Sequence, residues 1–289
     1  MRCPKCHFEN AEQSTECLKC GIVFAKYERS LEVHKPAPVT STEEEPVLTR
    51  DDARRELLYR WFALPAALIS ARLLVSIAPA AVRILSMWIH ECGHAVTAWL
   101  CGFPAFPGPW FTPVDTERSR PLAVMFVGLI GFGGFRAWKQ QRWVLVVSSA
   151  AVLIVQFIFT VRLYSDQAQQ LIIFGGDAGC FVLGSILIAT FYAGRESAIY
   201  QNSLRWGFLA IGALAFMDAF AVWSHVDSIP FGENENGLSD PSVLTDLYGW
   251  GIKQLLDRYY HLAVFCLAAL AVVYAVGLAQ AQMEYRRSS

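Results

Sequence analysis

Seven long apolar runs constrain the fold of this chain more than any other feature of its sequence. Their approximate bounds are 61–79, 82–101, 121–135, 143–163, 171–193, 207–224 and 259–280. A helix of about 20 apolar residues crosses a bilayer, and most of these runs have that length. Charged residues make up only 17% of the chain, whereas soluble domains contain about 25%. We therefore expect an all-α polytopic membrane bundle that lies in a lipid bilayer.

The run 121–135 is short and rich in glycine, so it is the one least suited to crossing. Basic residues precede the first run and recur in 102–142, around 195–205 and at the C-terminus, whereas the segment 225–257 is mainly acidic. If 121–135 is re-entrant or interfacial, six spans remain and all basic clusters fall on one side, which is then cytosolic. We expect about six transmembrane helices plus this segment, with both chain ends in the cytosol.

The first 28 residues contain two CxxC pairs, and each pair presents two thiolates to one ion. A segment this short buries no core, so the metal has to supply its folding energy. We expect a zinc ribbon at 1–28, a flexible linker at 29–55 and a membrane domain at 56–289. The near-zero net charge of −1 indicates no nucleic-acid partner. The structural zinc ligands are expected to be Cys3, Cys6, Cys17 and Cys20.

The second run contains the HExxH motif His90-Glu91-Cys92-Gly93-His94. The two histidines are four residues apart, so both rings lie on one helical face and suit a single zinc ion. Glu91 is then placed to take a proton from a water on the metal. Ionisable side chains inside a membrane helix are costly and usually functional. The alternative is a polar contact between helices, which rarely needs this spacing.

The motif, followed by the small residues Ala95 and Ala98, resembles the site-2 protease-type intramembrane metalloproteases. The resemblance implies a helical membrane bundle that cleaves other proteins within or near their transmembrane helices. It also implies a third zinc ligand, an Asp of a later helix, usually within Leu-Asp-Gly. Asp177 is the counterpart, although Gly176 and Ala178 stand where that motif has Leu and Gly.

The depths of His90 and Asp177 in their apolar runs also bear on the choice of the third zinc ligand. His90 lies roughly 12 Å into its run and Asp177 roughly 9 Å, at 1.5 Å per residue. These depths match if the two helices run in the same direction, as the six-span arrangement requires. Asp218 lies well inside a later run and is the rival ligand. Asp227, His225 or the absence of a third protein ligand are the remaining alternatives.

Together these features predict an intramembrane zinc endopeptidase with one catalytic and one structural zinc ion. Glu91 would activate the zinc-bound water, and the substrate would be a transmembrane or membrane-proximal segment of a membrane protein. The proline-rich stretch 104–113 and the glycine-rich stretch 128–134 are candidates for a wall that receives an extended substrate strand. We expect a bacterial inner-membrane protein with a cytosolic ribbon, which is free to bind a protein partner. Two alternatives stay open: a non-proteolytic membrane adaptor with structural zinc sites, and a membrane hydrolase of a non-peptide bond.

Overall fold

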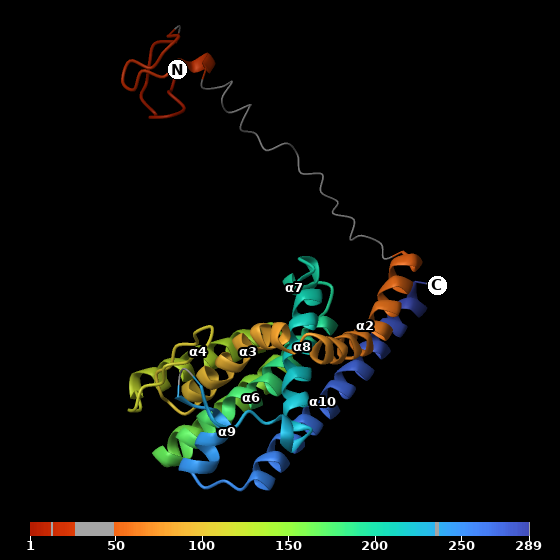
Figure 1. Cartoon of the computed structure of the whole chain (residues 1–289). Coiled ribbons are helices and arrows are strands. Elements are labelled where there is room, and N and C mark those ends of the chain that lie inside the picture. The colour runs from red at the N-terminus through yellow and green to blue at the C-terminus, as the bar shows by residue number, and fades with distance from the viewer. Residues whose placement is uncertain (13, 27–48, 235–236, 289) are drawn as a thin grey trace. The chain divides into compact units, whose positions relative to one another are not determined.

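A computed structural model describes residues 1–12, 14–26, 49–234 and 237–288 of the chain. It divides into two compact units, Met1–Leu48 and Thr49–Ser289 (Figure 1). Most of the linker predicted for 29–55 lies outside the described residues. Its last part, 50–55, is not a linker, because Thr49 caps a helix there by accepting a hydrogen bond from the Asp52 backbone N–H at 3.2 Å.

The first unit contains two CxxC knuckles with the same geometry. The backbone N–H of Cys3 donates to the carbonyl of Phe8 at 2.9 Å, and that of Cys17 donates to the carbonyl of Ile22 at 2.9 Å. Each knuckle is closed by an isolated antiparallel bridge between its flanking residues. The sulfur atoms of four cysteines lie within 4.8 Å of one another, an arrangement that fits a zinc ribbon: Cys3, Cys6, Cys17 and Cys20.

The second unit is helical. Six of its described helices are long and apolar enough to cross a membrane, which confirms the predicted all-α bundle. They are α2 (Arg50–Ile77), α4 (Arg120–Lys139), α5 (Trp143–Val161), α6 (Ser165–Ala189, extended by η1, Thr190–Tyr192), α8 (Leu204–Trp223) and α10 (Ile252–Arg287). The HExxH motif lies in a further long helix, α3 (Pro79–Leu100). The short elements are α7 (Ala198–Gln201), η2 (Val226–Ser228), the antiparallel strands β1 (Glu233–Asn234) and β2 (Gly237–Leu238), α9 (Asp240–Ser242) and η3 (Val243–Leu247).

The glycine-rich run 121–135 is the first departure from the sequence prediction. It forms most of α4, a regular helix that pairs with α5 as a hairpin. The Gln156 side chain of α5 donates to the Ala123 carbonyl of α4 at 3.0 Å, and Gly134 packs against Ser149. Glycine costs a helix interior about 1 kcal/mol relative to alanine, and it is common in membrane helices. The glycines of this run therefore do not interrupt the helix.

The runs 61–79 and 82–101 were expected to be two separate spans. They form α2 and α3, and α3 continues in the same direction as α2. Arg60 of α2 contacts Gly277 near the end of α10, Ser86 of α3 contacts Cys180 in the middle of α6, and His94 of α3 contacts Ile172 nearer the start of α6. The two helices together therefore make one pass through the unit. The start of α2 and the end of α10 consequently lie side by side (Figure 1).

Helices α3 and α6 are antiparallel, and the prediction that they run in the same direction was wrong. Their contacts run in opposite order along the chain, from Ser86–Cys180 to His90–Asp177 and then to His94–Ile172. Helix α6 begins before its apolar run, because polar residues continue it back to Ser165. His90 and Asp177 each lie near the centre of their helix. Their depths therefore match in either direction.

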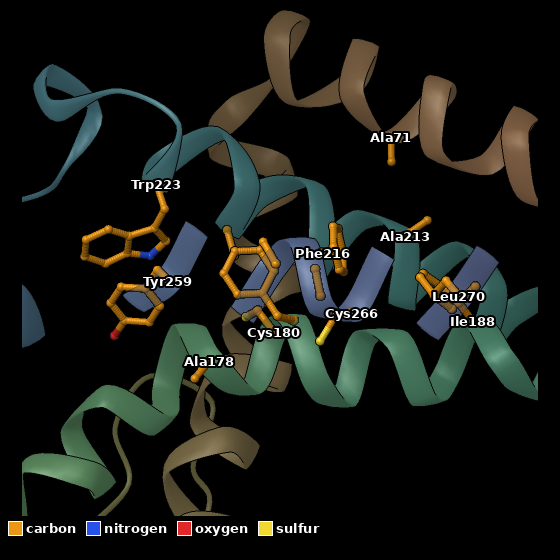
Figure 2. Packing of buried hydrophobic residues seen from close by; sticks show 14 of the residues in the cluster. Ala71, Ala178, Cys180, Ile188, Ala213, Phe216, Trp223, Tyr259, Cys266 and Leu270 are labelled. Carbon is orange, nitrogen blue, oxygen red and sulfur yellow. The ribbon is translucent and has the colours of Figure 1, made fainter. Parts of the chain in front are cut away.

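The main core lies between α2, α6, α8 and α10 (Figure 2). Phe181 of α6 meets Phe216 of α8 edge to face, with ring centroids 5.2 Å apart. Trp223, the last residue of α8, stacks on Tyr259 of α10 with centroids 3.9 Å apart. This aromatic pair lies against the middle of α6, where Asp177 is located. The core therefore supports the HExxH helix from behind α6.

Candidate metal centre

Close packing of α3 on α6 brings His90 to the carboxylate of Asp177 and His94 to the backbone carbonyl of Ile172. A methyl group at Gly93 of α3 would collide with the carbonyl of Gly175, so only glycine permits this approach. His90 Nδ1 lies 2.9 Å from Asp177 Oδ1, and His94 Nδ1 lies 2.8 Å from the carbonyl oxygen of Ile172. Each Nδ1–H has an acceptor, which is the usual arrangement that leaves Nε2 free to bind a metal.

The two free nitrogens point at each other. His90 Nε2 and His94 Nε2 are 3.0 Å apart, and both side chains are buried. A methyl group at Gly176 would lie 2.5 Å from His94 Nε2 and 2.7 Å from His90 Nε2. The space beside both nitrogens is therefore open because residue 176 has no side chain. This cradle fits a metal ion bound by the two rings.

A third side chain reaches the same point from α9. Asp240 Oδ2 lies 3.1 Å from the Nε2 atoms of both His90 and His94. Ligands of a tetrahedral zinc ion with bonds of 2.0–2.2 Å are about 3.4 Å apart, so these three atoms fit one ion. Burial opposes ionisation of Asp240, but the two imidazole rings outweigh it and hold the pKa of its carboxyl well below the usual range.

The predicted third ligands lie elsewhere around the pair. Asp177 contacts His90 as expected, but through Nδ1, and together with Cys180 it forms a second possible metal group on that side of the ring. Asp218 instead pairs with Arg83 at 3.1 Å and accepts a hydrogen bond from Ser86. Among the residues that the structure describes, Asp218, Asp227 and His225 belong to neither metal group around His90. The assignment of Asp177 as a ligand stays a prediction.

Glu91 lies beside the histidine pair and is held from a second segment. It is 4% exposed, and the hydroxyl of Thr112 lies 2.7 Å from its Oε2 and 3.0 Å from its backbone oxygen. That hydroxyl donates its proton to the carboxylate, an acceptor that forms the stronger bond. Thr112 therefore orients the carboxylate expected to act as the base.

A cavity of about 380 Å³ opens onto these groups. One wall is the connector between α3 and α4, where the backbone N–H of Phe106 donates to Pro113 at 3.2 Å and that of Asp115 donates to Pro104 at 2.8 Å. The end of the proline-rich stretch 104–113 lines the cavity through residues 110–112, and its backbone is strand-like rather than helical; its role in receiving a substrate stays a prediction. The glycine-rich stretch 128–134 lies in α4 and is not part of the lining. The opposite side comes from the α8–α10 connector, with Pro230, Leu238, Ser239, Asp240 and Pro241.

Asp240 and Thr112 were missed by reasoning from the sequence. Both lie in connectors outside the long helices, and neither is part of a spaced motif. The sequence marks the segment 225–257 only as mainly acidic, yet one of its carboxylates, that of Asp240, faces the two histidines. The sequence offered one weak signal, because Asp followed by Pro is typical of a helix start.

The second candidate site is the cysteine cluster of the first unit. Burial opposes ionisation of Cys17, but the backbone N–H groups of Cys20 and Lys19 and the neighbouring thiols lower its pKa to about 6. Cys6 Sγ lies 3.6 Å from Cys17 Sγ, so one sulfur donates a proton to the other while no metal is bound. A zinc ion there would bind all four sulfurs as thiolates.

Comparison with known protein families, with curated proteins and with solved structures finds no match for this chain. The functional argument therefore rests on the geometry of these residues. That geometry places two metal-binding nitrogens, a carboxylate and a buried glutamate at one cavity.

Proposed function

We propose that this protein is an intramembrane zinc endopeptidase of the site-2 protease type. One observation carries the proposal: the Nε2 atoms of His90 and His94 meet in a cavity that Glu91 also lines. Imidazole nitrogens and a carboxylate oxygen form the usual donor set of a catalytic zinc, and the cradle at Gly176 leaves room for the ion. The membrane zinc would be held by the two histidines and one carboxylate, and the ribbon zinc by four thiolates.

A zinc ion bound there would polarise a carbonyl group and lower the pKa of a coordinated water. Glu91 is the general base: it accepts a proton from the attacking water and delivers it to the nitrogen of the leaving amine. Thr112 holds the Glu91 carboxylate in place through its 2.7 Å hydrogen bond. The acceptors on Nδ1 of both rings, Asp177 and the carbonyl of Ile172, fix how the two imidazoles are oriented.

The connector wall supports an extended peptide as substrate. Pro113 and Asp115 use their backbone groups to pair with the first half of the connector. Residues alternate along a strand, so the backbone groups of Thr112 and Val114 face the other way. Both of these residues line the cavity. A substrate segment that has unwound can add to this edge as a strand, with its carbonyls beside Glu91.

Glu91 argues against one of the two competing functions, the non-proteolytic membrane adaptor. A structural metal site in a membrane adaptor needs no base, and this buried carboxylate has a dedicated hydrogen-bond donor in Thr112. Hydrolysis of a non-peptide bond would use the same groups. Only a comparison of peptide and non-peptide substrates can therefore distinguish that activity from proteolysis. We place the protein in the bacterial inner membrane with the ribbon in the cytosol, where it is free to bind a protein partner.

The test is cleavage by protein reconstituted in liposomes with candidate single-span substrates. We expect Glu91→Gln to lose at least 100-fold in rate, the lower end of what a general base contributes. Glu117→Gln is the matched control, because this exposed glutamate lies in the same connector as Thr112. Equal cleavage by wild type and Glu91→Gln would refute Glu91 as the base. Hydrolysis of lipid esters but of no peptide by wild type would favour the non-peptide hydrolase.

A further inference from the structure

The carboxylate that completes the membrane metal site is not one of the helix aspartates suggested by the sequence. We infer that Asp240 is the third metal ligand, and that the bound metal thereby ties the segment 238–250 to α3. This segment, called the strap below, begins at the last residue of strand β2 and contains α9 and η3. The inference rests on the proposed zinc site, but it does not depend on what the site cleaves.

The positions of the atoms distinguish Asp240 from its rivals. Asp240 Oδ2 is equally far, 3.1 Å, from the two nitrogens that face each other. Asp177 lies on the opposite edge of the His90 ring, and both of its oxygens are engaged, Oδ1 by His90 Nδ1 and Oδ2 by the Trp223 indole N–H at 2.8 Å. An imidazole binds one ion through one nitrogen. The metal shared by both histidines is therefore on the Asp240 side.

The contacts of Asp177 instead give it a positioning role. A carboxylate that accepts a hydrogen bond from a metal-bound histidine orients the ring and raises its basicity. Trp223 holds this carboxylate, and the Trp223 ring is stacked on Tyr259. The contacts run from Tyr259 through Trp223 and Asp177 to His90. They end at Nδ1, on the edge of the His90 ring that faces away from Asp240.

The strap is anchored to the bundle at its far end. Leu244 is fully buried, and the Trp250 indole N–H donates to the Gln170 side chain of α6 at 2.7 Å. Nearer Asp240, Ser242 Oγ accepts from the backbone N–H of Gly232, so its contact stays within the α8–α10 connector. The side-chain contacts of Asp240 that join this part to α3 are those with the two histidines.

This arrangement links metal occupancy to closure of the cavity. Leu238, Ser239 and Pro241 flank the proposed ligand and line the cavity opposite Thr112. When Asp240 binds the metal, these residues are held over the site. When the metal is removed, the part 238–242 loses its coordinate bond and keeps only the contacts of Asp240 with the two rings, while Leu244 and Trp250 keep the rest of the strap in place.

The first test reads the ligand directly in the full-length protein loaded with Co²⁺. Asp240→Cys and Asp177→Cys are compared with wild type by absorption spectroscopy. The ribbon thiolates contribute equally to all three spectra, so a gain in thiolate-to-cobalt charge transfer reports a new sulfur ligand. We expect the gain in Asp240→Cys alone. A gain in Asp177→Cys alone, or in neither variant, would overturn the inference.

The second test reads the strap by hydrogen–deuterium exchange with saturating zinc and with chelator. We expect zinc to slow exchange in 238–242 at least tenfold in wild type and in Asp177→Asn, and to leave it unchanged in Asp240→Asn. Zinc protection that survives in Asp240→Asn would contradict the inference. The inactive variant Glu91→Gln should keep the protection. Its behaviour separates a failed metal assignment from a failed peptidase proposal, which cleavage alone tests.

Discussion

At the scale of single residues, the candidate metal centre depends on two glycines as much as on its possible ligands. Gly93 lets α3 approach α6, and Gly176 leaves the space in front of both Nε2 atoms empty. Leucine stands at the position of Gly176 in the motif of the resembled family. Here the first carbon of such a side chain would lie against the Nε2 atoms of both histidines. The glycine is thus part of the site, although it contributes no ligand.

Gly176→Ala is therefore predicted to lose the membrane zinc. The added methyl would stand 2.5 Å from His94 Nε2, inside the space a metal would take. We expect elemental analysis to find one zinc ion fewer per chain than in wild type, with the ribbon zinc retained. Gly207→Ala is the matched control, because a methyl there meets nothing within 4 Å and should leave the zinc content unchanged. Full zinc content in Gly176→Ala would contradict the proposed position of the ion.

At the scale of elements, three helices are joined by a buried ionic cluster remote from the metal centre. Glu56 of α2 accepts from Arg60 at 2.8 Å and from Arg205 of α8 at 2.7 Å and 3.0 Å. Arg60 donates to the carbonyl of Gly277 in α10 at 3.2 Å, and Tyr200 donates to Glu56 at 3.1 Å. These hydrogen bonds join α2 to α7, α8 and α10, and the bond between Arg60 and Glu56 holds the two side chains of α2 in place. The cluster holds together the end of the unit at which α2 begins and α10 finishes.

Glu56→Gln should destabilise the membrane unit strongly. The substitution leaves two buried guanidinium groups without their carboxylate, and breaking a buried pair in this way costs about 3–5 kcal/mol. We expect a clear fall in thermal stability in detergent, followed by circular dichroism. Glu284→Gln breaks the half-exposed pair with Arg195 and should change the stability by less than about 1 kcal/mol. Similar losses in the two variants would argue against a structural role for the cluster.

At the scale of the whole molecule, the chain combines two units that fold for different reasons. The ribbon has a core of a few side chains around four sulfurs, whereas the membrane unit has a core shared by four helices. A segment as small as the ribbon depends on its metal for folding. The membrane unit keeps its helices through apolar packing and the buried cluster around Glu56, neither of which requires the proposed metal.

Metal removal should consequently affect the two units differently. After chelation we expect proteolysis within residues 1–26 to accelerate at least tenfold, while the helical content of the membrane unit remains. Cys17→Ser is the control, since its ribbon should be cleaved rapidly with or without chelator. Limited proteolysis and circular dichroism on the same sample provide the measurement. Loss of most helical signal on chelation would show that the membrane unit also depends on its metal.

The sequence alone determined the class of fold and the spacing of the candidate metal ligands. Apolar length predicts helices that cross a membrane, and the spacing of two CxxC pairs and of His90 and His94 predicts ligands on one ion, because these patterns are local. The tertiary structure decided what depends on distant segments: the antiparallel course of α3 and α6, the continuous pass of α2 and α3, and the approach of Asp240 and Thr112 to the site. These contacts arise from glycine-permitted packing and from connectors without a repeating pattern. No periodicity in the chain encodes them.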